Sequence, residues 1–382
     1  MSVYLDYNSS APIDSRVLDF MIDIYKNHIG NADSRTHDFG NHARQIVADA
    51  RKQIAHLLGV DSTEVFFTSG ATESSNIILQ GLQDYANVSG KKHIITTTIE
   101  HHAILNTCKM LEKHGFTVDY VNPEKNGRID ANEILSKVRD DTLLVAVMHV
   151  NNETGVIQPV QEIGEQLENK DVFFYVDATQ SAGKLVDEVS LLKYDMLSFS
   201  AHKLEGPQGI GVLVLRKKNY RLPPVKPIMY GGQQEHGLRP GTTPVALVGG
   251  LGKACEIAEK EYRQNSQKAK QIKAYILDAL KQSGVKYKIN GDQEHCIPSA
   301  INITFDGVSS EALMLATKQY LSISNESACN SKSYEPSYVL KAMGLKDDDL
   351  YDSVRMSWGP QTDPDAVEEN WKKLLMVVKS LQ

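Results

Sequence analysis

The feature that most constrains the fold of this chain is a regular alternation of short apolar segments and amphipathic helical patterns. It extends over roughly the first 215 of the 382 residues. The apolar segments are rich in β-branched and aromatic side chains, and the patterns between them have helical periodicity. Such an alternation predicts an α/β fold with a mostly parallel sheet of the seven-stranded type, covered by helices on both faces. The apolar segments are EVFFTSG at 64–70, HIITTT at 93–98, TVDYV at 117–121, TLLVAVMHV at 142–150, FFYVDA at 173–178, MLSFSA at 196–201 and GVLVLR at 211–216.

The pattern changes beyond this region. One long helical segment is predicted from about Pro244 to Ser283, ending at Gly284, and glycine commonly follows the last residue of a helix. Strand-like KYKIN, SAINITF and SVRMSW then mix with two helical patterns, which indicates a smaller α+β module. We expect a large domain at 15–255 and a small domain built from 1–14 and 256–382.

Composition and charge exclude several classes of protein. The formal net charge is −7 and no Lys/Arg block is present, so direct binding to nucleic acid is not expected. No apolar run approaches the roughly 18–20 residues that span a bilayer, and the first residues lack the features of a signal peptide. The four cysteines are scattered, with no CxxC, which argues against a disulfide framework or a zinc site and favours a cytoplasmic location.

Ligands of parallel sheets bind at the carboxyl ends of the strands, so the residues that follow each apolar segment are candidates for chemistry. Gly70, Ala71 and Thr72 follow the first segment and open a helix, where backbone N–H groups can bind an anion. An ordinary helix cap by Ser69 or Thr72 is the alternative.

A carboxylate and an amine follow two later strands. Asp177 comes directly after VFFYV, and a partly buried carboxylate there needs a cation or N–H donors, unless it caps a helix that begins near Ala178. Lys203 follows a strand that ends at Ser200. A desolvated lysine has a lowered pKa and can form a Schiff base with a carbonyl, although a lysine that reaches the surface is the alternative.

These groups together match the needs of pyridoxal phosphate. The helix N-terminus suits the phosphate, Asp177 suits the pyridinium nitrogen and Lys203 suits the aldehyde. His101, which follows HIITTTIE, could stack on the ring or could simply cap a helix.

Only one cysteine lies where packing gives no reason for it. Cys329 is in the polar segment SNESACNSKSYEPS at 324–337, whereas Cys108 and Cys255 lie in helical patterns and Cys296 precedes a strand.

Seven ordered motifs resemble those of the cysteine desulfurases, pyridoxal-phosphate enzymes of fold type I in the class V aminotransferase group. The resemblance is to the iron–sulfur-assembly and nitrogen-fixation type, which has a long catalytic loop, and it extends from YLDYNSSAP to WGPQTD. The motifs are SGATES, TIEHHA, MHVNNETG, VDATQS, SFSAHK, RPGT and SACNSKSYEPSYVL.

The resemblance implies a role for each matching residue. Lys203 is similar to the Schiff-base lysine, His101 to the stacking residue and proton relay, and Cys329 to the nucleophile that takes the sulfur. Asp177 resembles the partner of the ring nitrogen, and Gln180 the partner of the phenolic oxygen. The residues that resemble ligands of the phosphate are Gly70, Ala71, Thr72, Ser200, His202 and, from the second subunit of a homodimer, Thr242; those that resemble ligands of the substrate carboxylate are Asn152 and Arg355.

The implied activity is removal of sulfur from L-cysteine, giving L-alanine and a persulfide on Cys329 that passes to an acceptor protein. The acceptor could serve iron–sulfur cluster assembly, tRNA thiolation or DNA phosphorothioation. A selenocysteine lyase, another class V enzyme or a partner protein that kept the fold are the alternatives. Glu205, Gln208 and Asn330 depart from the usual motif residues without removing a catalytic group, and Glu205 adds negative charge near Lys203.

Overall fold

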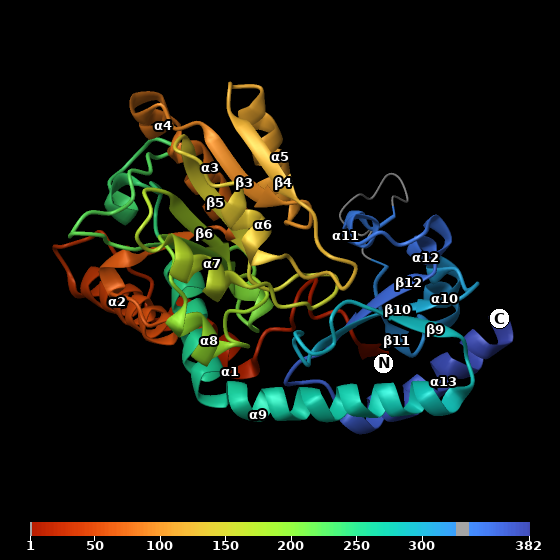
Figure 1. The fold of residues 1–382 in the computed structure, drawn as a ribbon. Coiled ribbons are helices and arrows are strands. Elements are labelled where there is room, and N and C mark those ends of the chain that lie inside the picture. The colour runs from red at the N-terminus through yellow and green to blue at the C-terminus, as the bar shows by residue number, and fades with distance from the viewer. Residues whose placement is uncertain (1, 326–335) are drawn as a thin grey trace.

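A computed structural model describes residues 2–325 and 336–382 of the chain. Its larger part is built around one seven-stranded sheet in the order β2-β8-β7-β6-β5-β3-β4 (Figure 1). Only β8 is antiparallel, to both β2 and β7. The seven predicted strands and the mostly parallel sheet are therefore confirmed. The strands are β2 (Val65–Thr68), β3 (His93–Thr97), β4 (Thr117–Val121), β5 (Thr142–Met148), β6 (Phe173–Asp177), β7 (Met196–Ser200) and β8 (Gly211–Leu215).

Helices cover both faces of this sheet, which is why its strands are apolar almost without interruption. Every residue of β5 is buried. One face packs against α3 (Ala71–Gly81), α4 (Gln83–Ser89) and α5 (His102–Glu112). The elements on the other face are α1 (Ser15–Asn27), α2 (Asp38–Leu58), α6 (Ala131–Ser136), α7 (Val160–Leu167), α8 (Val186–Leu191) and the first part of α9. Helix α2 begins at Asp38, because the His37 side chain accepts a hydrogen bond from Gly40 N and caps the helix there.

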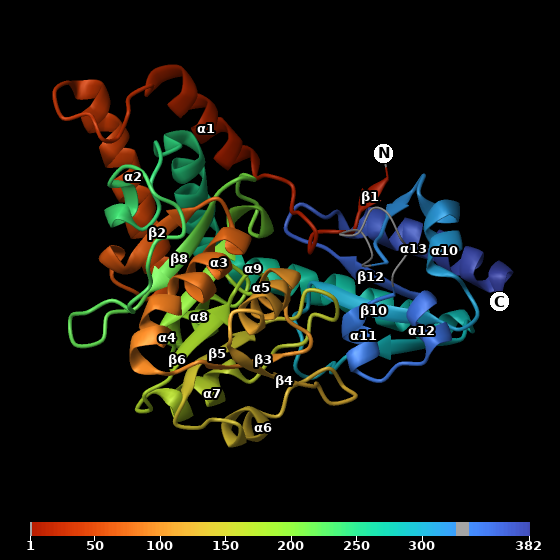
Figure 2. The ribbon, with the colours of Figure 1, turned by 90° about the horizontal axis from the view of Figure 1, so that it is seen from above.

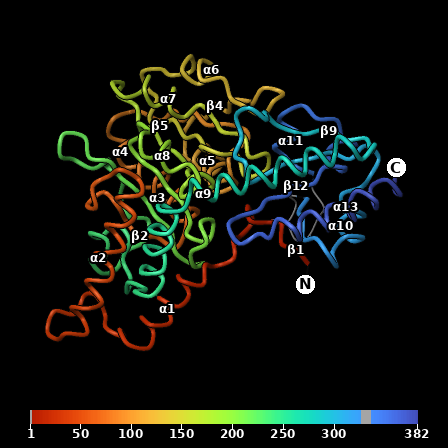
Figure 3. The backbone as a smooth tube through the Cα atoms, turned by 90° about the horizontal axis from the view of Figure 1, so that it is seen from below, coloured from red at the N-terminus to blue at the C-terminus, as the bar shows by residue number. Residues whose placement is uncertain are grey.

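The long predicted helix is present as α9 (Val245–Ser283), with Gly284 in the left-handed conformation after it. At 1.5 Å per residue it is about 58 Å long, and it runs beneath both parts of the molecule (Figures 1 and 3). Its first half packs against α1 and α2, and its second half packs against α13 (Pro364–Leu381). A single rigid element thus joins the two parts.

The smaller part contains the antiparallel sheet β12-β10-β9 and the two-stranded pair β1-β11. Its strands are β1 (Val3–Tyr4), β9 (Tyr287–Asn290), β10 (Ala300–Phe305), β11 (Leu321–Ser322) and β12 (Ser353–Ser357), and its helices are α10 (Ser310–Thr317), α11 (Tyr338–Ala342), α12 (Asp347–Tyr351) and α13. Leu5 belongs to its core. We propose the division into 15–255 and 1–14 with 256–382 on this packing.

The N-terminal segment crosses from the smaller part to the larger one before α1 begins (Figure 2). Val3 and Tyr4 pair with β11, and Asp6 forms a bridge with Ser357 at the end of β12. Among the described residues, no helix is both long and apolar enough to cross a membrane.

Candidate active site

A pocket of about 450 Å³ opens at the carboxyl ends of the central strands, between the two parts of the molecule. Residues from β12 and from the N-terminal segment close its other side. Most of the predicted site residues line it, namely Ala71, Thr72, His101, Asn152, Asp177, Gln180, Ser200, His202, Lys203 and Arg355. The topology therefore brings together residues that are up to 284 positions apart in the sequence (355 − 71).

Three predicted residues stand apart from this set. Gly70 does not line the pocket but immediately precedes α3, beside Ser200. Thr242 is exposed and does not line the pocket of this chain. Cys329 lies outside the described residues.

The first turn of α3 forms the anion-binding end of the pocket. The N-cap residue Gly70 has no side chain to cap this helix, so the N–H groups that follow Ala71 N are the ones that a phosphate could bind. Ala71 N donates to the Ser200 hydroxyl at 2.8 Å, which ties the helix to the end of β7. A Cβ atom on Gly211 would lie 2.5 Å from Gly70 Cα, so only glycine lets β8 approach this turn.

Lys203 points into the protein rather than toward solvent. Its ammonium group donates to the backbone carbonyl oxygens of Asn8 at 2.5 Å and Ser9 at 2.7 Å. The surface-lysine alternative is therefore wrong for this side chain. The N-terminal segment presents these two carbonyls, and the amine lies among the groups that line the pocket.

Asp177 is the last residue of β6, the strand beside β7, and Gln180 follows it in the chain. The Asp177 Oδ1 atom accepts hydrogen bonds from the Thr179 backbone N–H and hydroxyl, which fixes the direction of the carboxylate. No α-helix starts at Ala178, since the following residues form turns until α8, so Asp177 is not the N-cap of an α-helix. Gln180 is 3% exposed and donates to the Asn8 carbonyl oxygen at 2.9 Å.

His101 has both of the properties considered from the sequence. It is the N-cap of α5, with Nδ1 accepting from Ala103 N at 3.1 Å, and its ring lines the pocket. Burial lowers its pKa, Asp177 opposes this shift and Lys203 reinforces it. The ring is therefore neutral at neutral pH, and it carries its proton on Nε2 because Nδ1 is an acceptor.

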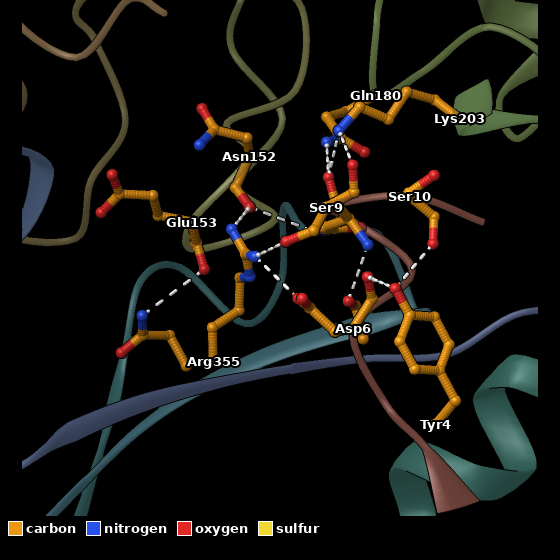
Figure 4. A network of polar contacts seen from close by, with 12 residues as sticks. Tyr4, Asp6, Ser9, Ser10, Asn152, Glu153, Gln180, Lys203 and Arg355 are labelled. Carbon is orange, nitrogen blue, oxygen red and sulfur yellow. Dashed lines mark hydrogen bonds and ion pairs between the residues drawn. The ribbon is translucent and has the colours of Figure 1, made fainter. Parts of the chain in front are cut away.

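Arg355 and Asn152 form the end of the pocket nearest the smaller part (Figure 4). The Arg355 guanidinium donates to Asp6 Oδ1 at 2.8 Å, to the Ser9 hydroxyl at 2.7 Å and to the Asn152 carbonyl oxygen at 3.1 Å. Within the described part of the chain, Asn152 Oδ1 is buried without a hydrogen-bond partner. A buried polar atom in this position fits a bound ligand.

Several residues of the site were not predicted from the sequence. Asp6, Asn8 and Ser9 belong to the quoted motif YLDYNSSAP, but their roles depend on a chain reversal that no local pattern reveals. The alternation of buried Leu5 and Tyr7 with polar neighbours was the available signal.

Glu100 was missed as well. Burial raises the pKa of its carboxyl group to about 8, although Met148 N and the Thr97 hydroxyl donate to it. The Tyr338 hydroxyl donates to the Glu100 carbonyl oxygen at 2.7 Å, so α11 is anchored at the edge of the pocket.

The chain matches the family described as aminotransferase class-V over residues 3–369. It is 43% identical to the cysteine desulfurase IscS of Photorhabdus laumondii over 96% of this chain and 90% of that protein. A solved structure described as a NifS-like protein has a TM-score of 0.91 at 34% identity, with 100% of both chains covered. Another, described as SspA in complex with cysteine, has a TM-score of 0.81 at 34% identity and covers 95% of this chain and 100% of its own.

This chain belongs to the class-V aminotransferase family, among relatives that are cysteine desulfurases. Enzymes of this family use pyridoxal phosphate. The residues present fit that group, because the pocket offers an uncapped helix N-terminus, a carboxylate and an inward-pointing lysine.

Proposed function

We propose that this chain is a pyridoxal-phosphate-dependent cysteine desulfurase that removes sulfur from L-cysteine and releases L-alanine. The observation that carries the proposal is the convergence of Lys203, Asp177, His101 and the N-terminus of α3 on one pocket. The identity to IscS and the likeness to a cysteine-bound SspA support the choice of reaction and substrate.

In this proposal each part of the cofactor meets one part of the pocket. The N-terminus of α3 with Thr72, Ser200 and His202 would hold the phosphate, Asp177 the ring nitrogen and Gln180 the phenolic oxygen. Lys203 would bind the aldehyde. When bound, the cofactor withdraws electrons from the amino acid attached to it and so weakens the bonds around its α- and β-carbons.

Arg355 and Asn152 would hold the substrate carboxylate. The planar fork of a guanidinium binds a carboxylate through two parallel hydrogen bonds. Asp6 and Ser9 accept hydrogen bonds from Nη2 of this guanidinium and fix its position at the pocket. The Asn152 backbone oxygen accepts from Arg355, and Asn152 lines the same pocket (Figure 4).

Lys203 and His101 would move protons. Lys203 is neutral once its proton passes to solvent or substrate, and its amine then accepts a proton from the α-carbon. His101, neutral with its proton on Nε2, can donate to the departing product and be reprotonated.

Cys329 is the proposed nucleophile. Its thiolate would attack the substrate sulfur, so that a sulfur–sulfur bond forms while the carbon–sulfur bond breaks and its electron pair stays with the substrate carbon. A proton then completes alanine, and the persulfide passes to an acceptor protein for iron–sulfur cluster assembly, tRNA thiolation or DNA phosphorothioation. We place the protein in the cytoplasm for this reaction.

We also propose a homodimer, in which Thr242 completes the phosphate site of the second subunit. Large apolar side chains are exposed on and after α1, with Tyr25 at 62% and Ile29 at 75%. Thr242 is exposed as well. A second copy of the chain would bury such a surface and bring Thr242 to a pocket that it does not line in its own subunit.

The decisive experiment measures alanine and sulfide released from L-cysteine by the pyridoxal-phosphate-loaded protein in the presence of a thiol. Wild-type protein should release both, and K203A should release neither. C329A should lose turnover with cysteine while it keeps the visible absorbance of the cofactor. Full cysteine turnover by C329A, with selenocysteine as the better substrate, would instead support a selenocysteine lyase.

A further inference from the structure

A second cavity, of about 80 Å³, shares Lys203 with the candidate active site. Its walls are mostly apolar and include Leu204, Ile257 and Trp358. Lys184 also lines this cavity, although it has no place in the proposed reaction. An amine in such surroundings is unfavourable unless it has a specific hydrogen-bond acceptor.

The acceptor is the side chain of Gln180. Lys184 Nζ donates to Gln180 Oε1 at 3.1 Å. The segment between β6 and α8 forms consecutive turns, with Ala182 N bonded to Ala178 O, so residues four positions apart lie on the same side. Lys184 therefore reaches Gln180 from the second cavity, while Gln180 lines the first.

Two contacts determine how the Gln180 amide is oriented. The Lys184 ammonium group can only donate, so the atom that it meets must be the amide oxygen. The Asn8 carbonyl can only accept, so the atom that it meets must be the amide nitrogen. Both contacts impose the same orientation, and the second N–H of Gln180 is then the group left to face a ligand in the pocket.

We propose that Lys184 is a positioning residue that fixes the Gln180 amide with its N–H directed toward the phenolic oxygen of the cofactor. The inference rests on the proposed function, which assigns Gln180 to that oxygen. Without Lys184, Gln180 Oε1 would be buried beside an apolar cavity with no donor. Only the Asn8 carbonyl would then hold the amide in this orientation, so the N–H that faces the phenolic oxygen would be less firmly fixed.

Lys184 also adds a titratable charge close to Lys203. Burial lowers the pKa of Lys184 to about 7; Lys203 and Arg355 act in the same direction, and Glu205 opposes them. The other ionisable groups that line this cavity are Tyr7, Asp14 and Tyr262. The hydrogen bond to Gln180 survives deprotonation, since a neutral amine still donates. The charge near Lys203, in contrast, appears only as the pH falls through neutrality.

The test compares K184M and K184R in wild-type and Q180M backgrounds. The first measurement is the dissociation constant of pyridoxal phosphate from the apoprotein, and the second is the pH midpoint of the visible absorbance of the loaded protein. K184M should weaken cofactor binding by about fivefold to tenfold and raise the pH midpoint, because a positive charge near Lys203 is lost. K184R should bind the cofactor as wild type does. In the Q180M background, K184M should cause little further loss of cofactor affinity.

K273M is a matched control, since the buried Lys273 donates to Cys296 and lines neither of the two cavities. It should leave both measurements unchanged, and melting curves of every apoprotein establish that each variant folds. The inference is overturned if K184M binds the cofactor as tightly as wild type does. It is also overturned if K184M weakens cofactor binding as much in the Q180M background as in the wild-type background. Absence of a visible band in wild-type protein would instead overturn the proposed function.

Discussion

At the scale of single residues, several ionisable groups around the site have pKa values that are shifted by burial. The pKa is raised to about 8 for Glu100 and about 7 for Glu205, and lowered to about 7 for Lys184 and about 4 for His202. The sequence predicted Lys203 and Asp177 because each follows an apolar strand. It could not predict Lys184 or Glu100, because nothing in their local patterns distinguishes a buried side chain from one on a solvated turn.

Glu205 leads to a prediction about stability and pH. Its pKa rises from 4.5 in an exposed carboxyl to about 7 in the folded chain, chiefly through burial. The folded chain therefore binds more protons than the unfolded chain between pH 4.5 and 7, and its stability falls as the pH rises through this window. E205Q should be more stable than wild type by on the order of 2 kcal/mol at pH 8 and nearly equal to it at pH 4.5.

Thermal melting of the apoprotein at the two pH values measures this difference. E188Q is a control of opposite sign, because the hydrogen bond from His149 lowers the pKa of Glu188, so its removal should destabilise the protein at pH 8. If E205Q gains as much stability over wild type at pH 4.5 as at pH 8, the buried-charge explanation is contradicted. Glu205 has a positive φ of 58°, and glutamine is chosen because it matches the size of glutamate at this position.

At the scale of elements, the strands were the easiest part to predict and the turns the hardest. Strands that are covered on both faces, such as β5, give continuous apolar runs, and α9 gives a long periodic pattern that ends at Gly284. In contrast, β1 has only two residues and carries no periodicity. Its pairing with β11 depends on contacts across the whole chain, so the origin of the Lys203 contacts could not be predicted.

The contact between α3 and β8 provides an element-scale prediction. A Cβ atom in G211A would meet Gly70 Cα and the Phe199 carbonyl oxygen, so the N-terminus of α3 must move away from Ser200. G211A should lose roughly 1–3 kcal/mol of stability and bind pyridoxal phosphate at least tenfold more weakly.

The matched control is G284A after α9, where a Cβ has open space and only the positive φ is unfavourable. It should lose about 1 kcal/mol of stability without any change in cofactor affinity. Equal cofactor affinity in G211A and wild type, measured by titration of the apoproteins, would refute the role given to this contact.

At the scale of the whole molecule, the pocket is completed by elements from both parts and, in our proposal, by a second subunit. T242V should then weaken cofactor binding although Thr242 lies away from the pocket of its own chain. Binding should also weaken on dilution of wild-type protein below the dimer dissociation constant, because the second phosphate ligand is lost.

Sedimentation at each concentration, with cofactor retention measured in the same samples, checks this prediction. A T242V variant that remains dimeric but holds less cofactor supports the assignment. The assignment is contradicted if cofactor retention does not change with protein concentration and is the same in T242V as in wild type. The sequence predicted this residue only through its resemblance to a family, since an exposed threonine in a loop has no distinguishing pattern.

The two carbonyl groups that hold Lys203 connect the reactive amine to the smaller part of the molecule. They belong to Asn8 and Ser9, in the stretch that pairs with β11 and β12. A substitution that loosened this pairing would therefore disturb the amine itself, and a change in the visible absorbance of the loaded protein would report the disturbance.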